Sequence, residues 1–292
     1  MTIDIEALDA DATHHFTPCG EGEMVWRDWG ALSPCGDNVV VLCHGGAGAW
    51  THWYRNIEAL RRHYRVLVPD LPGLGESAEL PSPYTVADAG RAVARGLELL
   101  LRARARIHLL TFSWGCSAGS SAARFLVDGA GPQVASLLMT GPAGLGPVSR
   151  GNMSPLLRRN AGMSAAEERE LHRENLARLM VYRRERISEL AVDLQVVNAN
   201  RSRFFSPGFA RETAVRDALE GSTMALAVIY GEHDAPVTPH FAERRAVLES
   251  VRPDVRFEVI PDVGHWVPYE WSGYNDYALA WLSEQVSDAA SP

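Results

Sequence analysis

The sequence predicts an α/β fold in which helices cover both faces of a mostly parallel sheet. Short runs rich in Val, Ile and Leu alternate along the chain with stretches of helical periodicity. This alternation favours parallel pairing, because each connection must cross back over the sheet. The runs are nearly continuous in apolar residues, which indicates strands buried on both faces. A length of 292 residues suits one large domain of this class or two small ones.

Six apolar runs are predicted as the strands of the sheet. They span residues 39–43, 65–68, 107–110, 134–139, 225–230 and 256–260. Residues 24–28 are predicted as a further, antiparallel strand at the edge. Residues 1–13 are rich in Asp and Glu, and we interpret them as a short, partly ordered lead-in.

Helices are expected between the strands, and the clearest covers residues 85–101. Apolar side chains recur there at helical spacing. Thr85, with Asp88 three residues later, forms an N-terminal cap of the capping-box type. Further helices are expected after His52, Ser113, Pro239 and Ser272.

Residues 146–221 interrupt the alternation, because they show helix signals and no strand pattern. Ser164 and Glu167 form a second capping box, and the apolar residues of 187–197 line one helical face. We therefore predict that residues 1–145 and 222–292 are two parts of one core domain and that 146–221 form an inserted helical cap. The cap is either a lid over a site at the strand ends or a structural excursion.

Composition and charge exclude some classes of binding partner and some cellular locations. The net charge of −8 argues against binding nucleic acid, which needs a basic face. No stretch approaches the roughly 18 consecutive apolar residues of a membrane span, and the N-terminus lacks the pattern of a signal peptide. We expect a cytoplasmic protein with a small-molecule substrate and with neither a nucleic-acid nor a membrane partner. A homodimer is compatible with the sequence.

The four cysteines do not suggest a metal site. No two of them have CxxC spacing, and we expect neither a metal nor another cofactor. Cys19 and Cys35 flank a predicted hairpin, and whether they pair stays open.

Ser113 is the candidate nucleophile. A buried strand ends just before it, and a helix of small residues begins just after it. Such a turn forces the serine into a strained backbone conformation that exposes its hydroxyl group. Gly115 fits this pattern, whereas Thr111 stands where glycine is usual. The alternative is a serine in an ordinary strand–helix turn.

A glycine-rich segment, His44 to Gly48, follows the strand at 39–43. Acyl transfer passes through an oxyanion, and two fixed backbone N–H groups can stabilise it. The arrangement assigns these donors to Gly46 and Trp114. The alternatives are a flexible loop or a phosphate cradle, although the segment lacks the Lys of a P-loop.

Asp234 and His265 each follow a predicted strand and complete the candidate triad. A serine needs a base, and the base needs an orienting acid. Because all three residues lie at the carboxyl ends of strands, they can converge. His233 is the second candidate for the base.

The nucleophile turn, the glycine-rich segment and the order Ser113, Asp234, His265 together resemble the α/β-hydrolase superfamily, over about residues 25–282. The resemblance implies an eight-stranded, mostly parallel sheet and a serine hydrolase. Residues 70–77 look like a structural loop of that family. The serine separates this chain from similar dehalogenases and epoxide hydrolases, which place an Asp at the turn.

Two branches of the superfamily share further motifs with this chain. Residues 50–56 and Gly264-His265-Trp266 are similar to the meta-cleavage-product hydrolases, which cut carbon–carbon bonds. Those enzymes bind a substrate carboxylate with an arginine on a lid helix. Here residues 187–199 contain no arginine, and Arg201 and Arg203 follow. Residues 44–48 and 113–115 are similar to proline iminopeptidases.

The leading hypothesis is hydrolysis of a small carboxylic ester, thioester or lactone through an acyl-enzyme on Ser113. The alternatives are carbon–carbon bond hydrolysis, iminopeptidase-like cleavage and a ligand-binding protein without catalysis. Residues flanking the motifs are expected to bind substrate, or in part to fill the core. They are His44, Gly45, Trp50, His52, Trp53 and Trp266. Arg183, Arg184 and Arg186 favour a solvated surface over an anion site.

Overall fold

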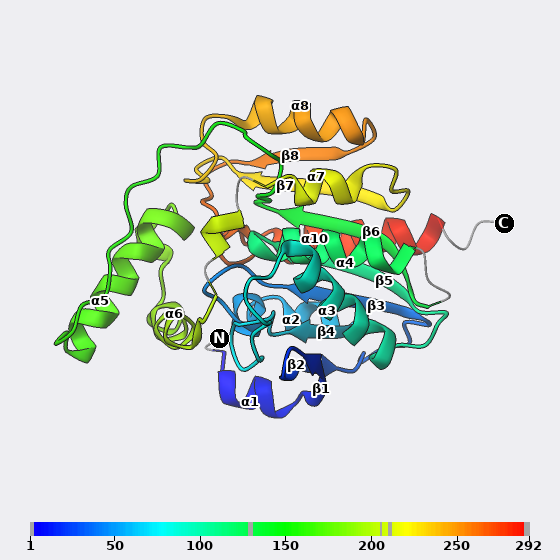
Figure 1. The fold of residues 1–292 in the computed structure, drawn as a ribbon, viewed down its shortest axis with the longest axis horizontal. Helices are drawn as coiled ribbons and strands as arrows, with labels where there is room; N and C mark the ends of the chain where they lie inside the picture. Colours follow the sequence, from blue (N-terminus) through cyan, green and yellow to red (C-terminus); the bar gives the residue numbers. More distant parts are fainter. Residues whose placement is uncertain (1–2, 128–130, 205, 210–211, 289–292) are drawn as a thin grey trace.

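An eight-stranded sheet forms the centre of the computed structural model, which describes residues 3–127, 131–204, 206–209 and 212–288 (Figure 1). The strands lie in the order β1-β2-β4-β3-β5-β6-β7-β8. Only β2 runs against the others, so the predicted mostly parallel sheet is confirmed. The strands are β1 Thr13–Cys19, β2 Gly22–Trp29, β3 Asn38–Cys43, β4 Arg65–Pro69, β5 Arg106–Phe112, β6 Gln133–Thr140, β7 Ala225–Gly231 and β8 Arg256–Ile260.

The antiparallel end of the sheet differs from the prediction. Residues 24–28 fall within β2, but β2 lies one strand in from the edge, and β1 pairs outside it. The sequence of β1 contains Pro18 and several polar residues, so its apolar periodicity is weak. Within the segment interpreted as a lead-in, the side chain of Asp4 accepts from two backbone N–H groups and caps helix α1 (Ile5–Ala10).

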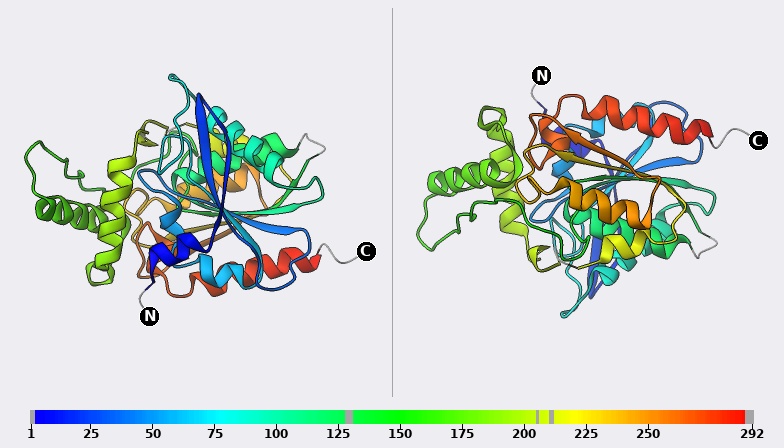
Figure 2. Two further views of the ribbon diagram at one scale, coloured as in Figure 1. Left: turned by 90° about the horizontal axis from the view of Figure 1, so that it is seen from below. Right: turned by 90° about the horizontal axis from the view of Figure 1, so that it is seen from above.

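Helices cover both faces of the sheet (Figure 2). Strand β3 shows why, because its alternate side chains enter two separate apolar clusters. One cluster receives Val39, Val41 and Cys43 together with α3, α4, α7 and α8, and the other receives Val40 and Leu42 together with α2 and α10. These helices are α2 Ile57–Arg61, α3 Val86–Leu100, α4 Trp114–Val127, α7 Ala214–Leu219, α8 Phe241–Val251 and α10 Tyr274–Asp288.

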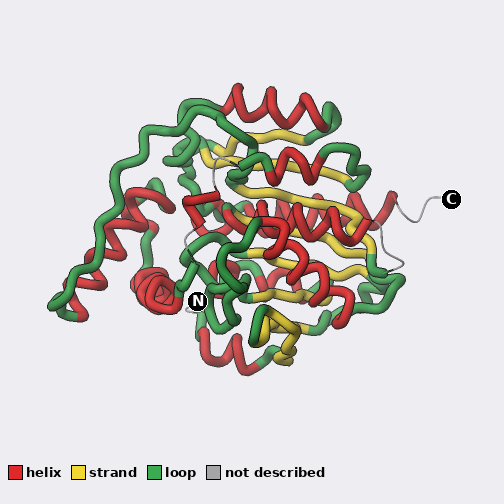
Figure 3. The backbone as a smooth tube through the Cα atoms, in the orientation of Figure 1, coloured by secondary structure: helices red, strands yellow, loops and turns green. Residues whose placement is uncertain are grey.

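The segment between β6 and β7 contains the helices of the proposed cap. A long loop without regular secondary structure leads from β6 to α5 (Ala165–Asn175) (Figure 3). Helix α5 continues into a π-helical turn, Leu176–Met180, and packs against α6 (Glu189–Arg201). The last helix of the segment, α7, packs on α4. Residues 146–221 therefore remain our proposed cap, with its final helix resting on the core.

Several local predictions can be checked directly. Both capping boxes, at Thr85 and at Ser164, have their two reciprocal hydrogen bonds. Cys19 and Cys35 are both free thiols. No helix in the described ranges has the length and apolar character needed to cross a bilayer.

His108 lies buried in the middle of β5. One ring nitrogen lies 2.8 Å from the Ser136 hydroxyl and the other 3.1 Å from the Asn38 side-chain oxygen. Burial, with a smaller effect of Arg106, lowers the pKa of His108 from 6.5 to about 4. The folded chain therefore holds this ring neutral where the unfolded chain protonates it.

We expect the free energy of unfolding to fall as the pH drops from about 6.5 towards 4. In that window the unfolded state binds a proton that the folded state excludes, which costs up to about 1.4 kcal/mol per pH unit for one group. The variant His108→Gln should show a shallower dependence in urea titrations across this window. His63→Gln, at an exposed position, is the control. Parallel curves for His108→Gln and the wild type would contradict the prediction.

Candidate active site

Ser113 occupies the sharp turn between β5 and α4. Its φ of 51° lies in the left-handed region, which costs energy for any residue with a side chain. Its backbone N–H donates to the carbonyl oxygen of Thr140 on β6 at 2.9 Å, and its carbonyl oxygen accepts from the N–H of Cys116 at 2.9 Å. These two bonds hold the strained turn and leave the Ser113 side chain half-buried beside a cavity.

The turn tolerates Thr111 because glycine stands opposite it on α4. A Cβ atom added at Gly119 would lie 2.7 Å from Cγ2 of Thr111, too close for either group to stay in place. The Thr111 hydroxyl lies 3.4 Å from the carbonyl oxygen of Leu138. Gly119, one helical turn beyond Gly115, therefore leaves the space that the methyl group of Thr111 occupies.

His265 and Asp234 form a buried pair at the ends of β8 and β7. Nδ1 of His265 lies 2.8 Å from Oδ2 of Asp234, and Asp234 is fully buried. Because the carboxylate accepts a hydrogen bond from the N–H at Nδ1, the ring keeps its proton there and Nε2 is free to act as a base. Gly141 leaves room for the pair, since a Cβ atom there would lie 2.8 Å from Cε1 of His265. Sequence reasoning missed Gly141, although it directly follows β6.

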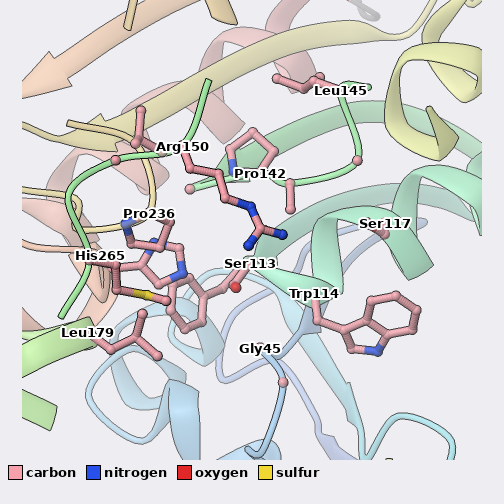
Figure 4. Close-up of a pocket in the computed structure, with 18 of the residues that line it drawn as sticks. Gly45, Ser113, Trp114, Ser117, Pro142, Leu145, Arg150, Leu179, Pro236 and His265 are labelled. Carbon is pink, nitrogen blue, oxygen red and sulfur yellow. The ribbon is translucent and has the colours of Figure 1, made fainter. Parts of the chain in front are cut away.

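Ser113 and His265 face the same cavity (Figure 4). Within the described ranges, no hydrogen bond joins the Ser113 hydroxyl to Nε2 of His265. Such bonds commonly tighten only when substrate is bound. His233, the second candidate base, instead stacks on Tyr182 with ring centroids 3.5 Å apart.

Gly46 and Trp114, the expected oxyanion donors, both line the same cavity. Neither backbone N–H donates to another residue in the described parts of the chain. Buried side chains that do not line the cavity bind the backbone of the loop that carries Gly46. The N–H of Gly45 donates to Nδ1 of His52 at 3.2 Å, and the N–H of Trp50 donates to Asp70 at 2.8 Å. Burial holds the pKa of His52 well below its usual value, so its ring stays neutral and can accept this bond.

Of the six residues expected to bind substrate, only Gly45 is among the described residues that line the cavity. The other five, His44, Trp50, His52, Trp53 and Trp266, are buried behind it. His44 shows the reason: one ring nitrogen bonds the Gly45 carbonyl oxygen at 2.8 Å and the other accepts from the N–H of Leu71 at 2.9 Å. The structure thus places these side chains where they support the loops rather than where they would touch a ligand.

The cavity has a volume of about 260 Å³ and mostly apolar walls. Many of these wall residues come from the cap segment and from the loop after Asp234, where sequence periodicity offers no signal. They include Val148, Met153, Leu156, Leu179, Met180, Phe209, Pro236 and Val237. Arg150 and Arg244 also line the cavity.

Glu270 joins the His265 loop to the cap, and sequence reasoning did not identify it. Its buried carboxylate accepts from the N–H groups of Gly264 at 2.7 Å, Tyr182 at 2.9 Å and Arg183 at 2.7 Å. One side chain therefore positions the chain on both sides of the cavity mouth.

Comparison with known proteins identifies the family of the chain. Residues 40–276 match the model of the alpha/beta hydrolase family. The chain belongs to that family. A 2-hydroxy-6-oxononadienedioate/2-hydroxy-6-oxononatrienedioate hydrolase of Cupriavidus pinatubonensis is 26% identical over 288 residues, which is 92% of this chain and 95% of the relative. A dihydrolipoyllysine-residue acetyltransferase component of an acetoin cleaving system from Pseudomonas putida is 29% identical over 87% of this chain and 66% of its own length.

Solved structures share the fold of this alpha/beta hydrolase. A putative aryl esterase from Burkholderia cenocepacia has a TM-score of 0.71 at 22% identity, covering 94% of this chain and 100% of that one. A meta-cleavage product hydrolase from Pseudomonas fluorescens has a TM-score of 0.68 at 18% identity, covering 91% of this chain and 95% of that one.

The arginines at and just after the end of α6 do not line the cavity of this hydrolase in its described parts. Arg201 pairs with Glu76 at 3.0 Å, and Arg203 donates to the carbonyl oxygen of Ser77. Both therefore tie the end of α6 to the loop after β4. Arg183 and Arg186 pair with Asp262, and Arg184 pairs with Glu174, all at the exposed surface.

Because Thr111 and Gly119 are in contact, we expect substitutions at these two positions to have coupled effects on the stability of this hydrolase. Gly119→Ala should lower the free energy of unfolding by about 1–3 kcal/mol, because the new methyl group overlaps Cγ2 of Thr111. In a Thr111→Ser background, which lacks that carbon, the same substitution should be neutral or stabilising, since Ala favours a helix over Gly by about 1 kcal/mol. Urea denaturation of the four proteins in the cycle measures the coupling. Additive effects would contradict the assigned contact.

Proposed function

We propose that this hydrolase cleaves a small carboxylic ester, thioester or lactone through an acyl-enzyme on Ser113. The observation that carries the proposal is the strained turn at Ser113, which shares one cavity with the buried His265–Asp234 pair. The free N–H groups of Gly46 and Trp114 at the same cavity support it. Strained backbone is costly and is often found where it serves a reaction.

In the proposed reaction, Nε2 of His265 takes the hydroxyl proton of Ser113 as its oxygen attacks the carbonyl carbon. The N–H groups of Gly46 and Trp114 stabilise the oxyanion, and the carboxylate of Asp234 stabilises the imidazolium. The imidazolium then protonates the departing alcohol, thiol or ring oxygen, and the acyl-enzyme forms. Water, deprotonated by His265, attacks this ester and releases the acid and the free serine.

A second candidate is hydrolysis of a carbon–carbon bond. The observation that favours it is the similarity to the Cupriavidus pinatubonensis relative, a hydrolase of 2-hydroxy-6-oxononadienedioate. The same nucleophile, base and oxyanion donors would act on a ketone carbonyl instead of an ester. Turnover of a dienoate diketone, set beside p-nitrophenyl esters, lactones and prolyl anilides, separates the two candidates and the iminopeptidase-like alternative.

We expect a fluorophosphonate probe to label Ser113 in the folded wild-type protein. Ser113→Ala should abolish this labelling and lower ester turnover by at least about 10³-fold, because the nucleophilic oxygen is gone. The measurements are mass spectrometry of the labelled peptide and kcat/KM on a panel of esters.

Ser120→Ala is the matched control on the same helix. The Ser120 hydroxyl is buried and bonds the carbonyl oxygen of Ser117 within α4, so labelling and turnover should persist. A wild-type protein that is not labelled would overturn the catalytic assignment and favour the ligand-binding alternative. Labelling retained in Ser113→Ala would place the nucleophile elsewhere.

A further inference from the structure

Arg150, a solvent-exposed residue, places a positive charge at the cavity without a matching negative one. Arg150 lines it, and its guanidinium end points towards Ser113 (Figure 4). Within the described ranges, no carboxylate or carbonyl oxygen accepts a hydrogen bond from this side chain, and no Asp or Glu lines the cavity. An arginine that lines an apolar cavity and has no ion-pair partner can bind an anion there through its planar set of donors.

The backbone around Arg150 is fixed in place. The N–H of Ser149 donates to Glu243 at 3.0 Å, and the carbonyl oxygen of Ser149 accepts from Arg244 at 2.6 Å. On the other side, the N–H of Gly151 donates to the carbonyl oxygen of Pro236 at 2.8 Å. Both flanking residues are thus bound to the segment that follows Asp234, and this anchoring fixes the backbone from which the Arg150 side chain extends.

The other arginine of the cavity cannot take this role. The guanidinium group of Arg244 is buried and donates to the carbonyl oxygens of Ser149 at 2.6 Å and of His240 at 3.1 Å. Its charge serves to hold the loop that carries Arg150.

Three other arginines of the cap segment are paired with carboxylates at the surface. Arg159 pairs with Glu168, Arg173 with Glu189 and Arg178 with Glu174. Arg158 has no described partner either, but it does not line the cavity. Arg150 therefore combines a position at the cavity with the lack of a described partner.

We propose that Arg150 binds a carboxylate of the substrate and so makes this hydrolase prefer anionic substrates. The proposal rests on the proposed function and names its substrate class: an ester, thioester or lactone that carries a free carboxylate. A planar guanidinium group can donate two parallel hydrogen bonds to a carboxylate.

The position of Arg150 separates this role from oxyanion binding. Gly45 and Trp114 lie on one side of Ser113, and Arg150 approaches from the opposite side (Figure 4). The carbonyl oxygen of a bound substrate would point towards the first side, and its carboxylate would point towards the second. The carboxylate belongs either to the acyl part or to the leaving group of the substrate, and the guanidinium group would bind it in the same way in both cases.

The test compares substrates that differ only in one charge. For the acyl part, the pair is mono-p-nitrophenyl adipate and the same molecule with its free carboxyl group capped as a methyl ester. For the leaving group, the pair is p-nitrophenyl hexanoate and the corresponding ester of a carboxyl-substituted nitrophenol. In wild-type protein, kcat/KM should favour the acid over its neutral partner in one of the two pairs.

In Arg150→Met this preference should fall by about 10–100-fold, the usual range for a lost charge-assisted hydrogen bond. Arg150→Lys should retain part of it, because it keeps the charge but loses the planar pair of donors. Arg158→Met, at an exposed position on the same loop, should keep the wild-type ratio. An unchanged ratio in Arg150→Met, or an equal loss for acid and neutral esters, would overturn the proposal.

Binding to the Ser113→Ala protein separates this inference from the proposed reaction. Calorimetry should show that monomethyl adipate binds Ser113→Ala and that adding Arg150→Met weakens the binding by about 10-fold or more. This result would support the carboxylate site even if the wild type failed to react with the fluorophosphonate probe. Equal binding to both proteins would overturn the carboxylate site while leaving the proposed reaction intact.

Discussion

The candidate site depends on how closely the turn after β5 approaches the end of β3. Gly115, in the first turn of α4, lies against the carbonyl oxygens of Cys43 and His44, where a Cβ atom would overlap both. Gly45 lies against the ring of Phe112 in the same way. These contacts bring the N–H groups of Trp114 and Gly46 to one cavity although the two residues are far apart in the sequence. A larger side chain at either glycine would separate the two donors that the proposed reaction needs.

Buried polar side chains then hold the loops that the sheet alone leaves free. His44 and His52 each bond the backbone around Gly45, and Asp70 bonds the N–H of Trp50. Burial lowers the pKa of both histidines, so each stays neutral and keeps one ring nitrogen as an acceptor, His52 for the N–H of Gly45 and His44 for the N–H of Leu71. On the other side of the cavity, Glu270 fixes the His265 loop to the cap. Loop positions that carry the chemistry are thus set by side chains that do not touch the cavity.

Most strands of the sheet and the three residues of the candidate triad could be predicted because their signals are local. Apolar runs mark the strands, and Ser113, Asp234 and His265 each follow such a run. The edge strand β1 was not predicted, because Pro18 and several polar residues weaken its apolar pattern. Aromatic residues near the motifs were expected at the cavity, but an apolar run does not show on which side of a loop its side chains will pack. Thr111 could not be explained from sequence, because its compensation by Gly119 depends on the crossing of a strand and a helix.

The net charge of the chain likewise does not predict the charge of the substrate. The chain carries a net charge of −8, which would suggest that it repels anions. At physiological ionic strength, however, interactions between exposed charges fade beyond about 8 Å. The walls of the cavity contain no acidic residue among those described, whereas Arg150 faces it directly. All 28 basic residues of the chain are arginines, and most near the cap are already paired with carboxylates. The few ångströms around Ser113 therefore decide which charge the site accepts, and the net charge of the chain does not.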